Sequence, residues 1–176
     1  MKKIIQKIFG LRTDVSLNFY LNGFVHKYIL RRNIDVPWMV HPTSTVFEAS
    51  KITRGKNVYP GDSPGNFIDG TNGVFIGDYT NLGPNVGIIS TNHNLIDNSK
   101  TEASPPIRIG RFCWIGMNAV ILPGVELGDF TIVGAGAIVS KSFPEGYCVL
   151  GGVPAQIINY LDKDACKQFS QTKYNS

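Results

Sequence analysis

Large aliphatic residues recur at every sixth position of this chain, and this period constrains its fold more than any other feature. In the C-terminal half the repeat is unbroken, with the members Ile109, Ile115, Ile121, Leu127, Val133 and Val139. Earlier members are Val40, Val46, Ile52 and Val58, followed by Ile76, Leu82 and Ile88. A short, strict period is typical of a solenoid, in which each unit buries its apolar side against its neighbours.

A period of six fits neither the 3.6-residue repeat of a helix nor the simple alternation of one strand. It suits a chain that turns a corner after each short strand, helped by small residues such as Gly116 and Gly134. Three units then make one triangular coil of about eighteen residues, and stacked coils pair their strands in parallel. The pattern predicts an all-β solenoid over residues 36–158, with Val58 and Ile76 one coil apart.

The repeat is interrupted after Ile88. The next member is due at residue 94, but the regular spacing resumes only at Ile109, which implies about fifteen inserted residues. The segment 90–106 is rich in Asn, Asp, Ser and Pro, which are typical of loops. We therefore expect an inserted loop near 90–106 that leaves one side of the solenoid.

Helices are predicted on both sides of the solenoid. Residues 2–9 read as a short basic helix, residues 15–31 as a longer amphipathic one, and residues 159–176 as a tail with a short helix. The apolar residues of the longer helix follow helical spacing: Leu17, Tyr20, Leu21, Phe24, Val25, Tyr28 and Ile29. Asp14 or Ser16 is the expected N-cap.

The segment 1–35 has two interpretations. Its apolar face is expected to cover the open end of the coil stack, where a solenoid needs a cap. The alternative is a helix that docks on a membrane surface or a partner, helped by basic residues at Lys2, Lys3, Lys7, Arg31 and Arg32.

Composition narrows the functional classes. The net charge of +4 comes without a basic run interleaved with aromatic residues, so a nucleic acid partner is not expected. The apolar runs are too short for a signal sequence or a transmembrane helix. Three cysteines without metal-ligand spacing predict no metal site, a buried and inert Cys113, and a reducing, cytoplasmic compartment.

Several stretches together carry a family resemblance: IGDYTNLGPNVGII, STNHN, IRIGRFCWIGMNAVILPGVELG, VGAGAIVSK and GGVPAQII. They resemble the hexapeptide-repeat acyltransferases, and in particular the O-acetyltransferases that modify galactosides, maltose, antibiotics and surface polysaccharides. The resemblance covers residues 40–158. It implies a left-handed parallel β-helix and a homotrimer with active sites between neighbouring subunits. It also implies acetyl-CoA as co-substrate and a small-molecule or saccharide acceptor.

His93 lies in the loop that breaks the repeat, and it matches the catalytic histidine of the family. Imidazole titrates at about pH 6.5, which suits a general base at neutral pH. It would take the proton of an acceptor hydroxyl as the oxygen attacks the acetyl carbonyl, and return it to the departing thiolate. Asn92 and Asn94 are either orienting residues or turn residues.

Trp114 occupies the tryptophan position of the family's WIG motif, where a flat apolar wall would line the substrate channel. Some relatives carry a serine three positions later, whereas this chain has Met117. The donor to the oxyanion would then be a backbone N–H, near Gly116.

The resemblance also implies the residues that would contact coenzyme A. Gly116, Gly134 and Ala135 are small enough for pantetheine to approach the backbone, and Ser140 and Lys141 match family positions beside the cofactor. Relatives often carry Arg or Lys after the GGVPA stretch, where this chain has Gln156 and Asn159. Either the affinity for coenzyme A is lower, or another residue such as Lys163 or Lys167 substitutes for the missing charge.

These residues predict an O-acetyltransferase acting on a sugar or a surface-polysaccharide precursor. Three alternatives stay open. The acceptor could be the amine of an amino sugar, with Asp62, Asp69 or Asp97 as acidic partners. The solenoid could bind sugar or scaffold an assembly without turnover. The third alternative is a zinc enzyme of the same fold. It is disfavoured because zinc catalysis needs about three protein ligands and His93 is the one histidine in the loop.

Overall fold

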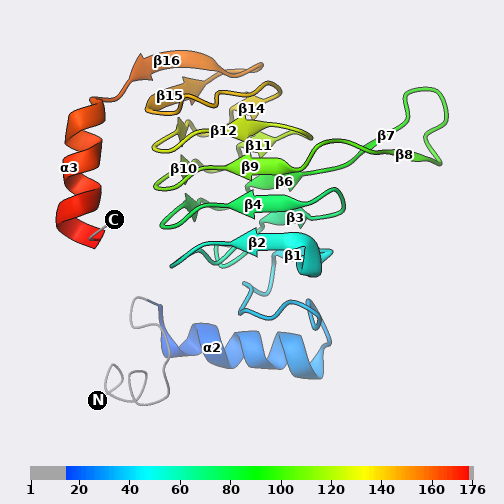
Figure 1. Ribbon diagram of the computed structural model, residues 1–176. Coiled ribbons are helices and arrows are strands. Elements are labelled where there is room, and N and C mark those ends of the chain that lie inside the picture. Colours follow the sequence, from blue (N-terminus) through cyan, green and yellow to red (C-terminus); the bar gives the residue numbers. More distant parts are fainter. Residues whose placement is uncertain (1–14, 175–176) are drawn as a thin grey trace.

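The computed structural model describes residues 15–174, and they form a stack of β-coils with one helix at each end of the chain (Figure 1). The chain visits three parallel sheets in turn, as in β9, β10 and β11 and then β12, β13 and β14. The result is a three-sided solenoid, in agreement with the six-residue period.

The three sheets are named A, B and C. Sheet A contains β1 (Thr45–Phe47), β3 (Phe67–Asp69), β6 (Gly87–Ile89), β11 (Val120–Ile121) and β14 (Ile138–Val139). Sheet B contains β2 (Ile52–Arg54), β4 (Val74–Ile76), β9 (Ile107–Ile109) and β12 (Glu126–Leu127). Sheet C contains β5 (Asn81–Leu82), β10 (Trp114–Ile115), β13 (Ile132–Val133), β15 (Cys148–Gly151) and β16 (Gln156–Tyr160). Within these sheets β16 alone is antiparallel to its neighbour.

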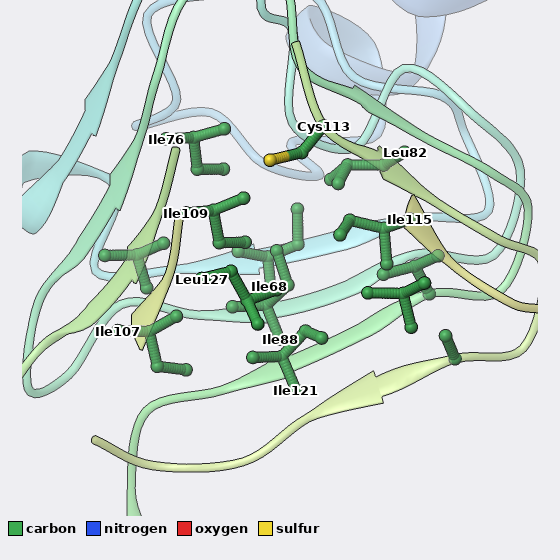
Figure 2. Close-up of a cluster of buried hydrophobic side chains, with 14 of the residues drawn as sticks. Ile68, Ile76, Leu82, Ile88, Ile107, Ile109, Cys113, Ile115, Ile121 and Leu127 are labelled. Carbon is green, nitrogen blue, oxygen red and sulfur yellow. The ribbon is translucent and has the colours of Figure 1, made fainter. Parts of the chain in front are cut away.

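The interior is built from the periodic aliphatic residues. Every member of the repeat from Val40 to Val139 is at most 8% exposed, and Figure 2 shows Ile109, Ile115 and Ile121 pointing into one common cluster. Burying one such side chain contributes about 1.5–3 kcal/mol, so the stack of coils is a continuous apolar core.

Strand register confirms the eighteen-residue coil in the upper part of the stack. Arg108 pairs with Glu126, Trp114 with Ile132, and Val120 with Ile138, each pair eighteen positions apart. Ile76 pairs with Ile109 across 33 positions, which is fifteen more than a regular coil. The extra residues lie between β6 and β9, where the sequence predicts an inserted loop near 90–106.

The lower coils are longer than predicted. Thr45 pairs with Phe67 and Arg54 with Ile76, so the first coils repeat after 22 positions. The prediction that Val58 and Ile76 lie one coil apart is therefore wrong. Turns add residues at the corners of these coils, as in the 3-10 helix η2 (Ala49–Lys51).

The N-terminal helix is present, but its orientation differs from the prediction. Helix α2 (Leu17–Phe24) continues as the π-helical turn η1 (Val25–Ile29), and the Ser16 hydroxyl accepts from the Phe19 N–H at 3.2 Å. The expected cap face does not cover the solenoid, since Phe24 and Ile29 are 55% and 65% exposed. The segment 2–9 and Asp14 lie outside the described residues.

The C-terminal helix α3 (Lys163–Tyr174) runs back along the corner between sheets B and C (Figure 1). At this corner four aromatic residues with positive φ stack in successive coils: Tyr79, Phe112, Phe130 and Tyr147. The Tyr174 ring of α3 stacks on Tyr79 with ring centroids 4.0 Å apart. Stacking of this kind contributes about 0.5–1.5 kcal/mol per pair and fastens the tail.

Candidate active site

The segment inserted after sheet A forms a hairpin that projects from the corner between sheets A and B (Figure 1). Its strands β7 (Asn92–His93) and β8 (Thr101–Glu102) are antiparallel, with His93 opposite Thr101. Asn92 and His93 are both exposed. The arrangement presents the imidazole to solvent on a two-stranded support outside the core.

Asn94 serves the turn of this hairpin. Its side-chain oxygen accepts from the N–H groups of Ile96 and Asp97 at 2.9 and 2.8 Å, and its amide donates to Glu102 at 2.7 Å. The turn is reinforced by Lys100, which pairs with Asp97 at 2.8 Å and lowers the pKa of that carboxyl. Asn94 is therefore a turn residue.

The base of the hairpin is held by Asn72, which sequence reasoning did not select. Its side-chain amide donates to the main-chain oxygens of Ser90 and Glu102 at 2.9 and 3.1 Å, and to the Ser104 hydroxyl at 3.2 Å. One asparagine thereby joins both arms of the hairpin to the turn below. The available signal was an Asn in a Gly-rich turn, and this signal is weak because Asn is common in turns for purely local reasons.

Beneath this clamp lies Asp69, which is 9% exposed. Its carboxylate accepts from the Thr71 hydroxyl at 2.5 Å and from the Ser90 hydroxyl at 3.4 Å. Both contacts organise the corner from which the hairpin leaves.

Trp114 lies on β10 in sheet C, between Asn81 of β5 and Ile132 of β13, and is 45% exposed. It borders a cleft of about 430 Å³ between sheet C and α3, whose other walls include Phe112 and Phe169. The indole therefore offers an apolar wall, as expected, but its immediate surroundings are the aromatic corner and the C-terminal helix.

Gly116 and Gly134 occupy the corner between sheets C and A, and the stacking of the coils requires them to be small. A Cβ on Gly116 would stand 2.7 Å from the Val133 oxygen, and one on Gly134 3.0 Å from the Leu150 oxygen. The Gly116 N–H donates to the Val133 oxygen at 2.8 Å, so this N–H is already used within the coil ladder. Ala135 in the same corner is exposed.

Lys141 and Gln156 are in direct contact. The Lys141 ammonium donates to the Gln156 side-chain oxygen at 3.0 Å and stands 5.5 Å from the centre of the Phe143 ring. Ser140 beside them is exposed at the end of β14. Lys163, the expected substitute cation, instead lies over the Tyr147 ring at the corner between sheets B and C.

One copy of the chain does not bring these groups together. The His93 hairpin leaves the corner between sheets A and B, whereas Trp114 lies on sheet C, on the side of α3 (Figure 1). In the described part of the chain no cluster of His, Cys, Asp or Glu could hold a metal ion. The same residues contain no helix long and apolar enough to cross a membrane.

Comparison with known proteins places this geometry in a family. Residues 106–141 match the family model described as bacterial transferase hexapeptide (six repeats). The galactoside O-acetyltransferase of Escherichia coli K12 is 36% identical over 141 residues, which cover 78% of this chain and 68% of that protein.

Two solved structures agree. A galactoside acetyltransferase in complex with coenzyme A is 26% identical, with a TM-score of 0.65 and 94% of each chain covered. A maltose O-acetyltransferase from Clostridium difficile 630 is 30% identical, with a TM-score of 0.57 and coverage of 65% of this chain and 62% of that one.

The three-sided solenoid is the fold of these acyltransferases, and in this chain the exposed His93 lies on the hairpin that interrupts the repeat. The chain belongs to the hexapeptide-repeat family of acetyl-CoA-dependent acyltransferases.

Proposed function

We propose that this protein transfers acetyl from acetyl-CoA to a hydroxyl of a sugar or of a surface-polysaccharide precursor, with His93 as the general base. The observation that carries the proposal is the exposed His93 on a clamped hairpin, at the one large interruption of the repeat. The similarity to galactoside and maltose O-acetyltransferases supports a sugar acceptor.

The reaction would be a direct transfer in a ternary complex. The His93 imidazole accepts the hydroxyl proton while the hydroxyl oxygen bonds to the thioester carbonyl carbon. The tetrahedral intermediate then collapses, the carbon–sulfur bond breaks, and the imidazolium returns the proton to the thiolate. The products are an acetyl ester and free coenzyme A, and no covalent enzyme intermediate is required.

Coenzyme A would lie along the edges of sheet A. Ser140, Lys141 and Gln156 would meet its polar groups, and Ala135 in the corner with Gly116 and Gly134 would let pantetheine approach the backbone. Gln156 carries no charge of its own, but its side-chain oxygen accepts from the Lys141 ammonium. It would thereby orient this ammonium toward a phosphate of coenzyme A.

We infer that the complete site needs a second subunit, in a homotrimer of left-handed coils like those of the family. Two observations support this. His93 and Trp114 lie on different sides of one copy, and Leu95 and Ile96 at the hairpin tip are both 98% exposed. Apolar side chains exposed to this degree on a clamped hairpin are typical of a contact with another chain.

The alternative amine acceptor has less support. Two of the three candidate carboxylates already have partners: Asp69 accepts from Thr71 and Ser90, and Asp97 accepts from Ser99 and Lys100.

The test is release of coenzyme A thiol from acetyl-CoA, measured with a panel of sugars and amino sugars. We expect a sugar to stimulate thiol release and His93→Ala to lower kcat by about 10²–10⁴-fold. Asn98→Ala, on the same hairpin and exposed, is the matched control and should retain activity. If His93→Ala keeps full activity, His93 is not the base. Failure of wild type to bind acetyl-CoA would favour a binding module.

A further inference from the structure

Helix α2 and the turn η1 carry an apolar surface that faces away from the solenoid. Its exposed members, here called the α2–η1 surface, are Leu21 (58%), Phe24 (55%), Val25 (41%), Tyr28 (55%), Ile29 (65%) and Leu30 (54%). Six large apolar side chains on two successive helical segments exceed the scattered exposure that is normal for a protein surface.

The other side of the same helix fixes this orientation. Gly23 is buried against Met39, and a Cβ at Gly23 would collide with the terminal methyl of Met39. The Lys27 ammonium donates to the Val36 main-chain oxygen, and the Phe19 ring lies 6.4 Å from the His41 ring. The helix therefore packs against the start of the solenoid through the side that carries Gly23. The apolar surface lies on the opposite side and points outward.

Charge is concentrated next to this surface. The charged residues of the segment 15–32 are Lys27, Arg31 and Arg32, which give it a net charge of +3. Residues 15–34 include no Asp or Glu. Arg31 and Arg32 follow the apolar surface directly, are exposed, and have no ion-pair partner among the described residues.

We propose that the α2–η1 surface docks on an anionic lipid membrane, lying in the plane of the headgroups. Phe24, Ile29 and their apolar neighbours would enter the headgroup boundary while Arg31 and Arg32 meet the lipid phosphates. A second copy of the chain fits this surface less well, because a symmetric contact would bring Arg31 and Arg32 of both copies together. An anionic surface complements the same charge.

The experiment is vesicle co-sedimentation of the full chain. Two kinds of vesicle are compared: phosphatidylcholine alone, and phosphatidylcholine with phosphatidylglycerol in roughly a 7:3 ratio. We expect binding to the anionic vesicles, little binding to the neutral ones, and release when salt rises from about 0.1 M to about 0.5 M, since salt screens exposed charges.

Two pairs of substitutions separate the apolar and basic contributions. Phe24→Glu with Ile29→Glu should abolish binding. Arg31→Gln with Arg32→Gln should lower the partition coefficient on anionic vesicles by roughly 10- to 30-fold and leave the small binding to neutral vesicles unchanged. The matched control is Ile158→Glu with Tyr160→Glu, which adds the same charge to exposed residues of β16 at the other end of the solenoid, and it should bind as wild type.

Each variant is checked by thermal unfolding and by light scattering without lipid. The proposal is overturned if wild type fails to bind anionic vesicles, or if the Ile158 and Tyr160 control loses binding to the same degree. A third result would also overturn it: wild type does not bind vesicles, and Phe24→Glu with Ile29→Glu lowers the mass measured by light scattering. The surface would then be a contact between copies of the chain. None of these results depends on acetyl transfer, so they are independent of the proposed enzymatic function.

Discussion

The side-chain amide of Asn72 donates a 2.9 Å hydrogen bond to the main-chain oxygen of Ser90, and this bond ties the turn of one coil to the root of the His93 hairpin in the next. The same amide also reaches Glu102 and Ser104 on the returning arm. Asn72 is therefore a positioning residue for His93, although it lies outside the hairpin.

Replacing Asn72 by Ala should loosen the hairpin root. We expect a loss of about 1–3 kcal/mol in the free energy of unfolding, because main-chain oxygens at the root lose their donor. We also expect kcat to fall roughly 10-fold or more while the KM for acetyl-CoA stays constant, since misplacement of the base affects chemistry more than cofactor binding. Steady-state kinetics and urea unfolding measure both. A parallel rise in the KM for acetyl-CoA would argue for a general structural defect instead.

Lys141 is predicted to bind a phosphate of coenzyme A. Lys141→Ala should raise the KM for acetyl-CoA by about 10-fold or more, because a charge-assisted contact is worth about 1.5–3 kcal/mol. Lys141→Arg should recover most of the affinity, and added salt should weaken wild type more than Lys141→Ala. Lys56→Ala, an exposed lysine elsewhere on the solenoid, serves as the control. Equal salt dependence in wild type and Lys141→Ala would contradict the assignment.

The hairpin tip is predicted to contact a neighbouring subunit. Leu95→Ser with Ile96→Ser should shift the mass measured by light scattering from trimer toward monomer, and should lower activity in proportion, since both residues are 98% exposed in a single copy. Ile158→Ser with Tyr160→Ser removes a similar apolar area elsewhere and should leave the mass unchanged. A variant that stays trimeric and active would show that the tip has no role in assembly.

Cys113 is predicted to be chemically inert. Burial raises the pKa of its thiol from 9.0 to about 12, so the thiolate fraction at pH 8 is about 1 in 10,000. Iodoacetamide followed by mass spectrometry should label the partly exposed Cys166 in the folded protein and Cys113 after unfolding. Rapid native labelling of Cys113 would place it outside the core.

The same thiol gives stability a pH dependence. Between pH 9 and about pH 12 the unfolded chain releases the Cys113 proton while the folded chain keeps it, because burial raises the pKa of the thiol in the folded state. The folded state then binds more protons, so this thiol makes the free energy of unfolding fall as pH rises through that window. Cys113→Ser should show a shallower fall, as measured by urea unfolding at successive pH values.

The core could be predicted residue by residue because its physical rule is local. In a chain that turns a corner every six residues, aliphatic side chains at every sixth position all point to the inside of the coil. The spacing from Ile109 to Val139 is therefore enough to identify the interior. The insertion followed from the same rule, since the register from Ile76 to Ile109 measures its length directly. The rule failed at Val58, where added turn residues changed the coil length without disturbing burial of the side chain.

Candidate residues for the site could be selected from the sequence, but their arrangement in space could not. His93 could be selected because it interrupts the pattern, and Lys141 because it matches a family position. Gln156 could be selected because it stands where relatives often carry Arg or Lys. The clamp by Asn72 could not be selected, because its three acceptors are 18, 30 and 32 positions away and meet only in the folded chain. The sequence also could not show that the coil ladder already uses the Gly116 N–H for the Val133 oxygen.

The sequence by itself determined the solenoid, its core and the place of the hairpin, since periodic burial depends on residues close together in the chain. Tertiary structure alone decided which side of α2 meets the first coil. Both sides carry residues able to pack, and the small Gly23 allowed closer approach to Met39 than the bulky apolar face would. It also decided that His93 and Trp114 lie on different sides of one copy. The hairpin with His93 projects from the corner between sheets A and B, whereas Trp114 lies on sheet C.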